Sequence, residues 1–569
     1  MKNKTWIKRL FGLMLATLFV ATSLATCAPL EPDGLLIDLT VARQALNPQG
    51  MPNEPGSPPT DIDTFRLCVL KAEGELVKCR TFDELEADRS YSLGDIPAGT
   101  RRIVTFQGYM AADEAVRWCG RATEVEIKHQ GTTRVEMMLS RCSDFTTTVG
   151  DPTVARIFHS GTLLPDGRVL IAGGFDAHAE GTRCDLACRE LQATNTVEIY
   201  DPTSGTFEQL NTGLTHPRGL HQAAVLQDGR VLLMGGCEVA SLQSDFVDSD
   251  QPGSPLRCVV PGLAASTIEI YNPASQSTQV VDIDPTVFAG MMPAADDQFL
   301  LVGGENADGE PINRALLITV GGSRVDIVKI ENPMEQARRA PMVVAFTSPD
   351  AEPAEGLLIG GRLSQDWFDP GDYAERLVFQ AGNLLSTVPR FVREVVGEGL
   401  PVMHACGVRI NPGRVLITGG IYPGRFNSLD EPFLPKPLAV TAVADLRLES
   451  LTVFGENDIL ADGRVFHSCT VVDNAGHALV AGGFSLEDPA APLRYQAIRD
   501  AEWWDDEAET FSLRWRDNQP ARMDAPRAGH SATLLQDGTV LLTGGSDGTD
   551  LLLSAELFNP SSTALDQVH

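Results

Sequence analysis

The sequence predicts an all-β fold: a seven-bladed β-propeller preceded by a small β-sandwich domain. An apolar run that closes on two glycines occurs seven times at nearly regular intervals, which is the signature of a repeat array. The 52 glycines and 36 prolines among 569 residues suit short strands joined by tight turns. A hydrophobic content of 43% is that of a globular chain. These three observations favour repeated antiparallel sheets.

The doubled glycines end an inner strand in each repeat. A chain that leaves a sheet beside a closely packed neighbour needs a backbone conformation that a Cβ atom would strain. We therefore interpret the glycine pairs as structural. They are Gly173 and Gly174, Gly235 and Gly236, Gly303 and Gly304, Gly360 and Gly361, Gly419 and Gly420, Gly482 and Gly483, and Gly544 and Gly545.

Residues 1–26 are typical of a lipoprotein signal peptide. Four basic residues precede an apolar run at 10–20, which is too short to span a bilayer. The run ends in Leu24-Ala25-Thr26-Cys27, which resembles a bacterial lipobox and implies that Cys27 carries a lipid. Thr26 departs from the Gly, Ala or Ser usual before that cysteine, so cleavage without lipidation is the alternative. Residues 27–33 would link the anchor to the first domain.

The leader and the charge together predict a location and exclude one class of partner. A lipidated Cys27 places the chain in a bacterial cell envelope, as an outer-membrane lipoprotein that faces either the periplasm or the exterior. The formal net charge of −31 repels phosphate backbones, so we expect no nucleic-acid binding. Membrane contact is expected through the lipid anchor alone.

Residues 34–142 predict the β-sandwich. Alternating runs at 35–41, 64–70, 102–107, 123–127 and 133–139 read as strands separated by turns. The turn Pro97-Ala98-Gly99-Thr100, which leads into a strand, resembles small carboxypeptidase regulatory modules; an immunoglobulin-like sandwich is the other form considered. Residues 143–152 are expected to be a linker, and 153–569 to form the propeller.

The cysteine count predicts disulfides. Removing Cys27 leaves ten cysteines, and an even number in an exported chain favours pairing. Cys406 and Cys469 each follow a repeat histidine by two positions in adjacent repeats, so a bridge between those repeats is a hypothesis and two buried thiols are the alternative. Proximity suggests the other pairs: Cys68 with Cys79, Cys119 with Cys142, Cys184 with Cys188, and Cys237 with Cys258.

The first repeat shows the full pattern. Arg156 and His159 precede a strand, the turn Asp166-Gly167, a second strand and the glycine pair; a third strand with Glu198-Ile199-Tyr200-Asp201-Pro202 follows. Asp-Gly between two strands is a hairpin signal, and we expect positive φ at both residues. The pattern resembles the kelch repeat over residues 150–569, which implies seven four-stranded blades. The third and fourth repeats depart from it around Ala289 and Pro341, and how the ring closes is left open.

Five histidines recur before the glycine pairs: His159, His221, His404, His467 and His530. Each lies at nearly the same distance along the sequence before the first glycine of its pair. The resemblance to the kelch repeat, whose blades use this position in their own fold, implies that these histidines are structural. A metal ring around the channel is the alternative. The arginines three positions earlier, which are Arg156, Arg218, Arg464 and Arg527, are expected to order the turn that leads into each blade.

An enzymatic alternative comes from copper radical oxidases that resemble galactose oxidase and share a kelch propeller. In that family a tyrosine directly before the repeat histidine binds copper. The corresponding residues here are Phe158, Leu220, Met403, Phe466 and Gly529. Tyr373, Tyr422 and Tyr495 are the tyrosines left without another role, and none adjoins a histidine. This disfavours a phenolate–copper site.

No resident cofactor is expected, although two metal sites were considered. His178, Cys184 and Cys188 could bind a soft metal, but a disulfide that closes the loop is favoured. Carboxylates after the glycine pairs could bind calcium, although none matches a complete calcium loop. These carboxylates are Glu305, Asp308, Glu310, Asp547, Asp550, Asp245, Asp248 and Asp250.

The functional prediction rests on the loops that follow the glycine pairs. The longest and least alike are 175–195, 237–266, 421–438 and 484–499, and all should emerge on one face of a propeller. A rigid scaffold that presents divergent loops is typical of recognition. We therefore expect a non-catalytic binding or scaffold protein that contacts a protein or a glycan through this face. A diverged copper radical oxidase, a glycan-acting enzyme and a purely architectural envelope component are the alternatives.

Overall fold

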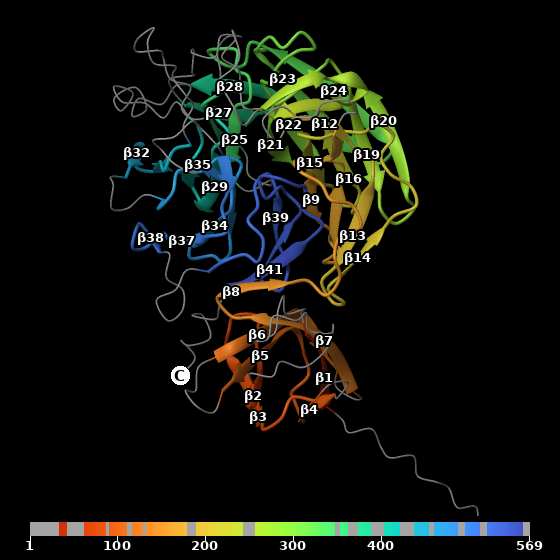
Figure 1. Ribbon diagram of the computed structural model, residues 1–569, viewed down its shortest axis with the longest axis vertical. Helices are drawn as coiled ribbons and strands as arrows, with labels where there is room; N and C mark the ends of the chain where they lie inside the picture. Colours follow the sequence, from red (N-terminus) through yellow and green to blue (C-terminus); the bar gives the residue numbers. More distant parts are fainter. Residues whose placement is uncertain are drawn as a thin grey trace, which may run out of the picture.

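The computed structural model describes residues 34–41, 62–86, 90–110, 116–128, 132–178, 189–242, 256–347, 353–361, 374–387, 403–421, 437–454, 460–486, 495–512 and 521–560. Over these residues the protein is all-β with one short helix, α1 (Gly262–Ala265). Two bodies are visible, a smaller sheet domain and a ring of blade-like sheets (Figure 1). None of the described helices is long and apolar enough to cross a membrane.

The first domain is a single seven-stranded sheet folded over one core. Its order is β3-β2-β5-β6-β7-β1-β4. In the described part of the domain, β6 and β7 share only the pairs Trp118–Arg141 and Cys119–Ser140, so the two halves diverge there and enclose a common apolar core. The strands are β1 (Gly34–Val41), β2 (Thr64–Leu70), β3 (Leu76–Phe82), β4 (Tyr91–Gly94), β5 (Gly99–Tyr109), β6 (Val116–Ile127) and β7 (Thr132–Arg141).

The expected sandwich therefore differs in detail from the observed domain. The two faces that enclose Phe65, Phe106 and Leu139 are continuous through hydrogen bonds, whereas a sandwich would have two separate sheets. The five predicted strands are present, and β3 and β4 are additional. Sequence alternation does not identify β3 because its side chains are mostly exposed on both faces.

Seven further sheets have four antiparallel strands each, and we call them blades 1 to 7 in chain order. The strands of each blade are given from the inner to the outer one. Blade 1 has β9 (Ser160–Leu163), β10 (Val169–Ala172), β13 (Val197–Asp201) and β14 (Thr206–Gln209); blade 2 has β15 (Gln222–Val225), β16 (Val231–Met234), β19 (Thr267–Asn272) and β20 (Ser277–Asp282); blade 3 has β21 (Gly290–Ala295), β22 (Gln298–Val302), β23 (Arg314–Gly321) and β24 (Arg324–Glu331); and blade 4 has β25 (Met342–Ala345), β26 (Ala354–Ile359), β27 (Glu375–Gln380) and β28 (Asn383–Thr387). Blade 5 has β29 (Cys406–Asn411), β30 (Arg414–Thr418), β31 (Thr441–Asp445) and β32 (Ser450–Val453); blade 6 has β33 (Ser468–Val471), β34 (Ala478–Ala481), β37 (Ala501–Asp505) and β38 (Thr510–Ser512); and blade 7 has β39 (Ser531–Leu534), β40 (Val540–Thr543), β41 (Ala555–Asn559) and β8 (Asp144–Thr147). The second strand of each blade is the apolar run that precedes a glycine pair, and it is almost wholly buried.

The last blade corrects the expected linker at 143–152 and shows how the ring closes. β8 is the outer strand of blade 7, where Phe145 pairs with Phe558. The strand that completes the last sheet thus comes from before the first blade. In Figure 1, β8 lies between the first domain and the ring. Pairing between the segments that precede and end the repeat array closes the ring without a free end.

The glycine pairs join neighbouring blades. Gly173 and Gly174 have φ of +61° and +89°, which L side chains rarely adopt. The Gly174 N–H donates to the Arg218 carbonyl of blade 2 at 2.9 Å. Gly545 of blade 7 makes the same bond to the Arg156 carbonyl of blade 1 at 2.8 Å. The pairs therefore end one strand and hold the next blade.

The Asp-Gly hairpin turns differ from the expected geometry. Of Asp166 and Gly167 only the glycine has a positive φ, +89°. The Asp166 carboxylate instead accepts the N–H of Arg168 at 3.1 Å. This is a three-residue turn with one left-handed residue, which glycine or Asp297 (φ +51°) can supply.

Four disulfides are present among the described residues: Cys68–Cys79, Cys119–Cys142, Cys237–Cys258 and Cys406–Cys469. Several disulfides in one chain are typical of an extracytoplasmic protein. The expected Cys184–Cys188 pair lies outside the described residues. Cys406–Cys469 joins the inner strands of blades 5 and 6.

One more four-stranded sheet is built from the loops that follow the first two glycine pairs, and we call it the cap sheet. Its order is β11-β12-β17-β18, and the β12–β17 pairing joins the two loops. A hairpin after the sixth glycine pair, β35 (Phe484–Leu486) with β36 (Tyr495–Ala497), lies in the same apolar cluster. The strands of the cap sheet are β11 (Phe175–His178), β12 (Arg189–Ala193), β17 (Val239–Leu242) and β18 (Leu256–Val260).

Candidate functional site

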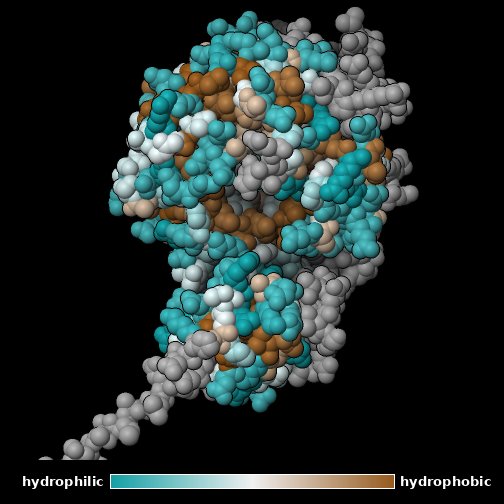
Figure 2. All heavy atoms as spheres, turned by 180° about the vertical axis from the view of Figure 1, so that it is seen from behind, coloured by the Kyte–Doolittle hydropathy of each residue, from teal (hydrophilic) through white to brown (hydrophobic). Residues whose placement is uncertain are grey.

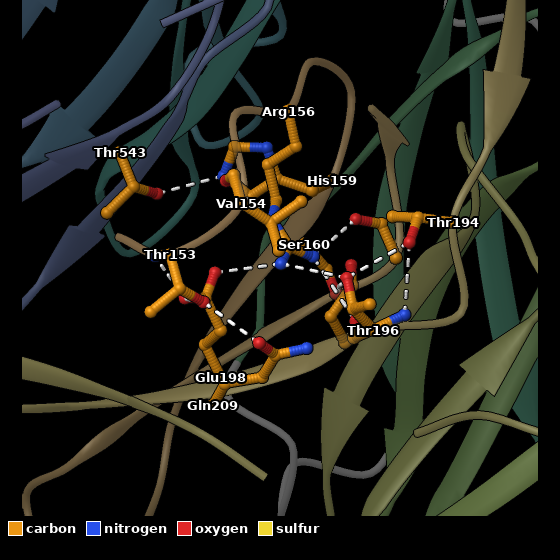
Figure 3. A network of polar contacts seen from close by, with 12 residues as sticks. Thr153, Val154, Arg156, His159, Ser160, Thr194, Thr196, Glu198, Gln209 and Thr543 are labelled. Carbon is orange, nitrogen blue, oxygen red and sulfur yellow. Dashed lines mark hydrogen bonds and ion pairs between the residues drawn. The ribbon is translucent and has the colours of Figure 1, made fainter. Parts of the chain in front are cut away.

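A buried arginine–glutamate pair lies at the inner end of five blades. In blade 1 the Arg156 guanidinium contacts the Glu198 carboxylate at 2.8 Å (Figure 3). It also donates to the Gly173 carbonyl at 2.7 Å. Neither side chain is more than 1% exposed. The other pairs are Arg218–Glu269, Arg338–Glu375, Arg464–Glu502 and Arg527–Glu556. The pairs fix the loop that leads into each blade to its glycine turn and its third strand.

The sequence indicated part of this arrangement. The four arginines were expected to order these turns, but their glutamate partners were noted only as part of a strand motif. Arg338 was missed because the longer hairpin of blade 4 places it further before Gly360 than Arg156 lies before Gly173. In the blades that have the ion pair, the glutamate lies on the third strand, opposite the residue two positions before the first glycine of the pair. The residue at this position is Leu316 in blade 3 and Ala442 in blade 5.

Four histidines join consecutive blades through their side chains. His159 Nε2 lies 2.9 Å from the Thr543 hydroxyl of blade 7, as Figure 3 shows, and His221 Nε2 lies 2.9 Å from the Ser160 hydroxyl of blade 1. His467 and His530 make the same contact with Thr418 and Ser468. The four residues come from blades 6, 7, 1 and 2.

These histidines are neutral at physiological pH. Burial, followed by the charge of Arg218, lowers the pKa of His221 to about 3. Burial and Arg527 do the same for His530, whose pKa is also about 3. The pKa of His159 and that of His467 are lowered well below the usual value, again mainly by burial. In the part of the chain that is described, no group of three or more His, Cys, Asp or Glu side chains is arranged to hold a metal.

His404 is not equivalent to the other four histidines, which corrects the sequence alignment. Cys406 pairs with Thr418, so the residue opposite Gly419 is Ala405. In blade 6 Ser468 pairs with Ala481, which puts His467 opposite Gly482. His404 therefore lies one position earlier. His404 and His467 nevertheless lie the same number of residues before the first glycine of their pairs. This is because the hairpin turn of blade 6 has one extra residue, whereas that of blade 5 has the ordinary length.

The register defines two rings of residues around the central channel. We call the first ring the collar; its members all have φ between +49° and +64°, and they are Phe158, Leu220, Phe288, Ala340, His404, Phe466 and Gly529. The second ring, the histidine tier, follows the collar by one position and comprises His159, His221, Ala289, Pro341, Ala405, His467 and His530. Met403, which directly precedes a repeat histidine in the sequence as Phe158 and Phe466 do, is not in the collar but in a buried apolar cluster.

The collar and the histidine tier line one cavity of about 360 Å³. One side of the cavity is aromatic. There the ring centroid of Phe466 lies 5.1 Å from that of Phe158 and 4.8 Å from that of His404. Gln222 and Met342 are the other lining residues. The cavity therefore combines an aromatic side with the polar imidazole groups of the histidines.

The cap sheet covers the collar on its other side. Phe175, Leu191, Ala240 and Leu256 of the cap sheet form one buried cluster with residues of the inner loops. Phe158, Leu220, Phe288 and Phe466 pack against this cluster. Tyr495 is in it too, with its ring 6.3 Å from Phe484, and burial raises its pKa. Tyr373 and Tyr422 lie outside the described residues.

Two of the carboxylates considered for calcium, Glu305 and Asp547, have contacts within the protein. Glu305 forms an ion pair of 2.6 Å with Arg339, and both are buried beside the collar. Asp547 Oδ1 accepts the N–H groups of Thr549 and Asp550 at 2.7 and 2.8 Å. Cys184, Cys188, Asp245, Asp248 and Asp250, like the side chain of His178, lie outside the described residues.

The fold and site together define a mostly β protein with a propeller-like repeat of four-stranded antiparallel sheets. No model of a known protein family matches the chain, and no characterised protein matches its sequence.

Proposed function

We propose that the chain is an exported, lipid-anchored binding or scaffold protein of the bacterial outer membrane. In this proposal Cys27 carries the lipid, the first domain is a spacer, and the ring is a seven-bladed kelch-type propeller. The face that carries the cap sheet contacts a protein or a glycan, without catalysis.

The observation that carries the proposal is the cap sheet. Two loops, each of little regularity in sequence, pair with each other through β12 and β17, and Cys237–Cys258 joins β18 to the start of the second loop. A loop surface that is ordered before binding loses less conformational entropy when a partner docks. Scaffold-mounted loops of this kind are a common place for recognition.

The outer edge of the cap sheet adds an apolar surface. Val259, Val260 and Leu263 are 44%, 43% and 56% exposed. Apolar patches bordered by polar residues mark contact sites more often than isolated apolar residues do. Elsewhere, in the view of Figure 2, apolar patches alternate with hydrophilic ones on the described surface.

A capture experiment tests the proposal. Cross-linking in intact cells with Val260→Asp and Leu263→Asp should remove partners that the parent chain captures. Val328→Asp is the matched control, because Val328 is 52% exposed on the outer strand β24, away from the cap sheet. Loss of the same partners in both variants, or capture by neither the parent nor the control, would contradict a cap-sheet contact.

The catalytic alternative has a separate test. A diverged copper radical oxidase would require stoichiometric copper in protein purified from the envelope. The collar holds Phe158, Leu220, His404 and Phe466 at positions where that family would place a tyrosine, which supports the binding proposal. Copper at one equivalent would replace it with the enzymatic alternative.

A further inference from the structure

We propose that the cavity between the collar and the histidine tier is a binding site for a compact, uncharged aromatic molecule. The site is independent of the cap-sheet contact, since it lies inside the ring. Four features carry the inference: size, lining, electrostatics and rigidity.

The size and lining fit a small aromatic ligand. The cavity of about 360 Å³ falls within the range of roughly 300 to 1000 Å³ seen for small-molecule sites. Phe158, Phe466 and His404 form a connected aromatic wall, with centroid separations of 5.1 and 4.8 Å. Such rings favour stacked or edge-to-face contacts with another aromatic group. The wall and the neighbouring Leu220 are only partly buried, so they keep accessible surface.

The electrostatics favour a neutral ligand. The histidine tier is uncharged, because burial first and the neighbouring arginines next lower the pKa values of its histidines. These arginines, which are Arg156, Arg218, Arg464 and Arg527, leave a positive potential at the tier despite their glutamate partners, and this disfavours a cation. The described residues that line the cavity include no Lys or Arg, so an anion would lose its hydration there without a charged side chain to pair with.

The collar is held in place by bonds between blades. The Leu220 N–H donates to the Phe158 carbonyl at 3.1 Å, and the Phe158 N–H donates to the Gly529 carbonyl at 2.8 Å. Gly529 in turn donates to the Phe466 carbonyl at 2.8 Å. The aromatic wall is therefore preformed, and binding requires little ordering of side chains.

The register supplies a variant that fills the cavity. Ala340 occupies in blade 4 the collar position that phenylalanine occupies in blades 1, 3 and 6, with φ of +49° against +55°, +54° and +55°. Ala340→Phe therefore places a ring that this backbone already accepts elsewhere. Phe466→Ala is the reciprocal change, since blade 4 shows that alanine is accepted at the same position.

The test uses N-phenyl-1-naphthylamine, a neutral aromatic fluorophore whose emission rises in apolar surroundings, with the purified full-length protein. We expect saturable binding of one probe per chain. Ala340→Phe should weaken binding at least tenfold while the melting temperature stays close to that of the parent. Phe466→Ala should weaken binding several-fold. Any probe in detergent contributes equally to parent and variants.

Leu385→Ala is the surface control, because Leu385 is 64% exposed on an outer strand. It should leave binding unchanged. The proposal is overturned if the parent shows no saturable binding, if a folded Ala340→Phe protein binds as tightly as the parent, or if Leu385→Ala removes binding. Should Phe466→Ala fail to fold, the comparison between the parent and Ala340→Phe decides the matter.

Discussion

Two halves of the ring hold the same architecture by different means. Blades 6, 7, 1 and 2 each contain a buried arginine–glutamate pair and a histidine that reaches the preceding blade. Blades 3, 4 and 5 have Ala289, Pro341 and Ala405 at the histidine position, and within their described residues one such ion pair, Arg338–Glu375. Inner-strand backbones nevertheless pair in the same register throughout.

The difference shows which parts of the repeat are indispensable. Glycine pairs with positive φ occur in every blade, because the turn geometry itself requires them. The polar contacts can be replaced: blade 3 uses Arg314, which donates to the Thr286 hydroxyl at 2.7 Å, and blade 5 is joined to blade 6 by Cys406–Cys469. The following predictions test this contrast, from the largest expected effect to the smallest.

The largest effect on stability is expected from breaking a buried arginine–glutamate pair in blades 6, 7, 1 and 2. Arg218→Met leaves Glu269 buried without its partner, and such a change costs about 3 to 5 kcal/mol. Urea unfolding measures the free energy of unfolding. Arg314→Met is the matched control in the other half; its partner Asp284 is 48% exposed, so the expected loss is about 1 kcal/mol or less.

The double variant separates the charge from the shape. Arg218→Met with Glu269→Met removes both charges, so most of the lost stability should return. If the double variant is as unstable as the single one, the other hydrogen bonds of the two side chains matter more than the charge pair. These are the guanidinium bonds to the Gly235 carbonyl and Thr267, and the bonds that Glu269 accepts from the N–H groups of Thr215 and His216.

The disulfide between blades 5 and 6 should rank second. It closes a sequence separation of 63, and replacing Cys406 and Cys469 by alanine should lower the free energy of unfolding by about 2 to 4 kcal/mol. Comparison of the urea midpoints of the parent and the double variant measures it. Unchanged midpoints would mean that strand packing alone joins these blades.

The loss of folding stability in acid should come mainly from the buried histidines of blades 6, 7, 1 and 2. The pKa of His221 is about 3 in the folded protein and about 6.5 when unfolded, so the unfolded state binds more protons between these values. Stability is therefore full above about pH 6.5 and falls as the pH is lowered. From pH 7 to pH 5 the expected loss is about 2 kcal/mol for this residue.

His221→Gln tests this by removing the titrating group. The loss of stability between pH 7 and pH 5 should be smaller in the variant than in the parent by about that amount. An identical pH dependence in both proteins would show that His221 does not carry the effect.

The smallest effect tests the register of blade 5. His467→Phe removes the contact with Thr418 and should cost about 1 to 2 kcal/mol, since the threonine hydroxyl is left buried. His404→Phe places at the collar a residue that three other blades have there, and should change stability by less than about 1 kcal/mol. If both substitutions lower the free energy of unfolding by the same amount, His404 would be equivalent to His467 after all, as their equal distance from the glycine pairs suggested.

Much of the fold could be predicted from particular residues. The glycine pairs located the second strand of every blade, and the Glu-x-Tyr motif located the third strand of blades 1 and 2. The position of β8 could not be predicted, because a short strand that pairs with the far end of the chain has no local signal beyond Phe145 and its neighbours. The cap sheet was missed for the same reason: β12 and β17 are short, and only their pairing defines them.

The candidate site was predicted in part. Counting back from the glycines found four equivalent histidines but misassigned His404, since a turn in blade 6 lengthens the count by one. The buried pairing of each arginine with a glutamate further along the chain was not visible, because the two motifs lie on different segments of the blade.

The sequence alone determined the repeat, the number of glycine turns and most of the disulfide pairs, because each depends on local backbone geometry or on nearby cysteines. Only the tertiary structure decided the closure by β8, the cap sheet and the register that separates the collar from the histidine tier. These depend on pairing between distant segments, and a shift of one position along a strand moves each side chain to the other face.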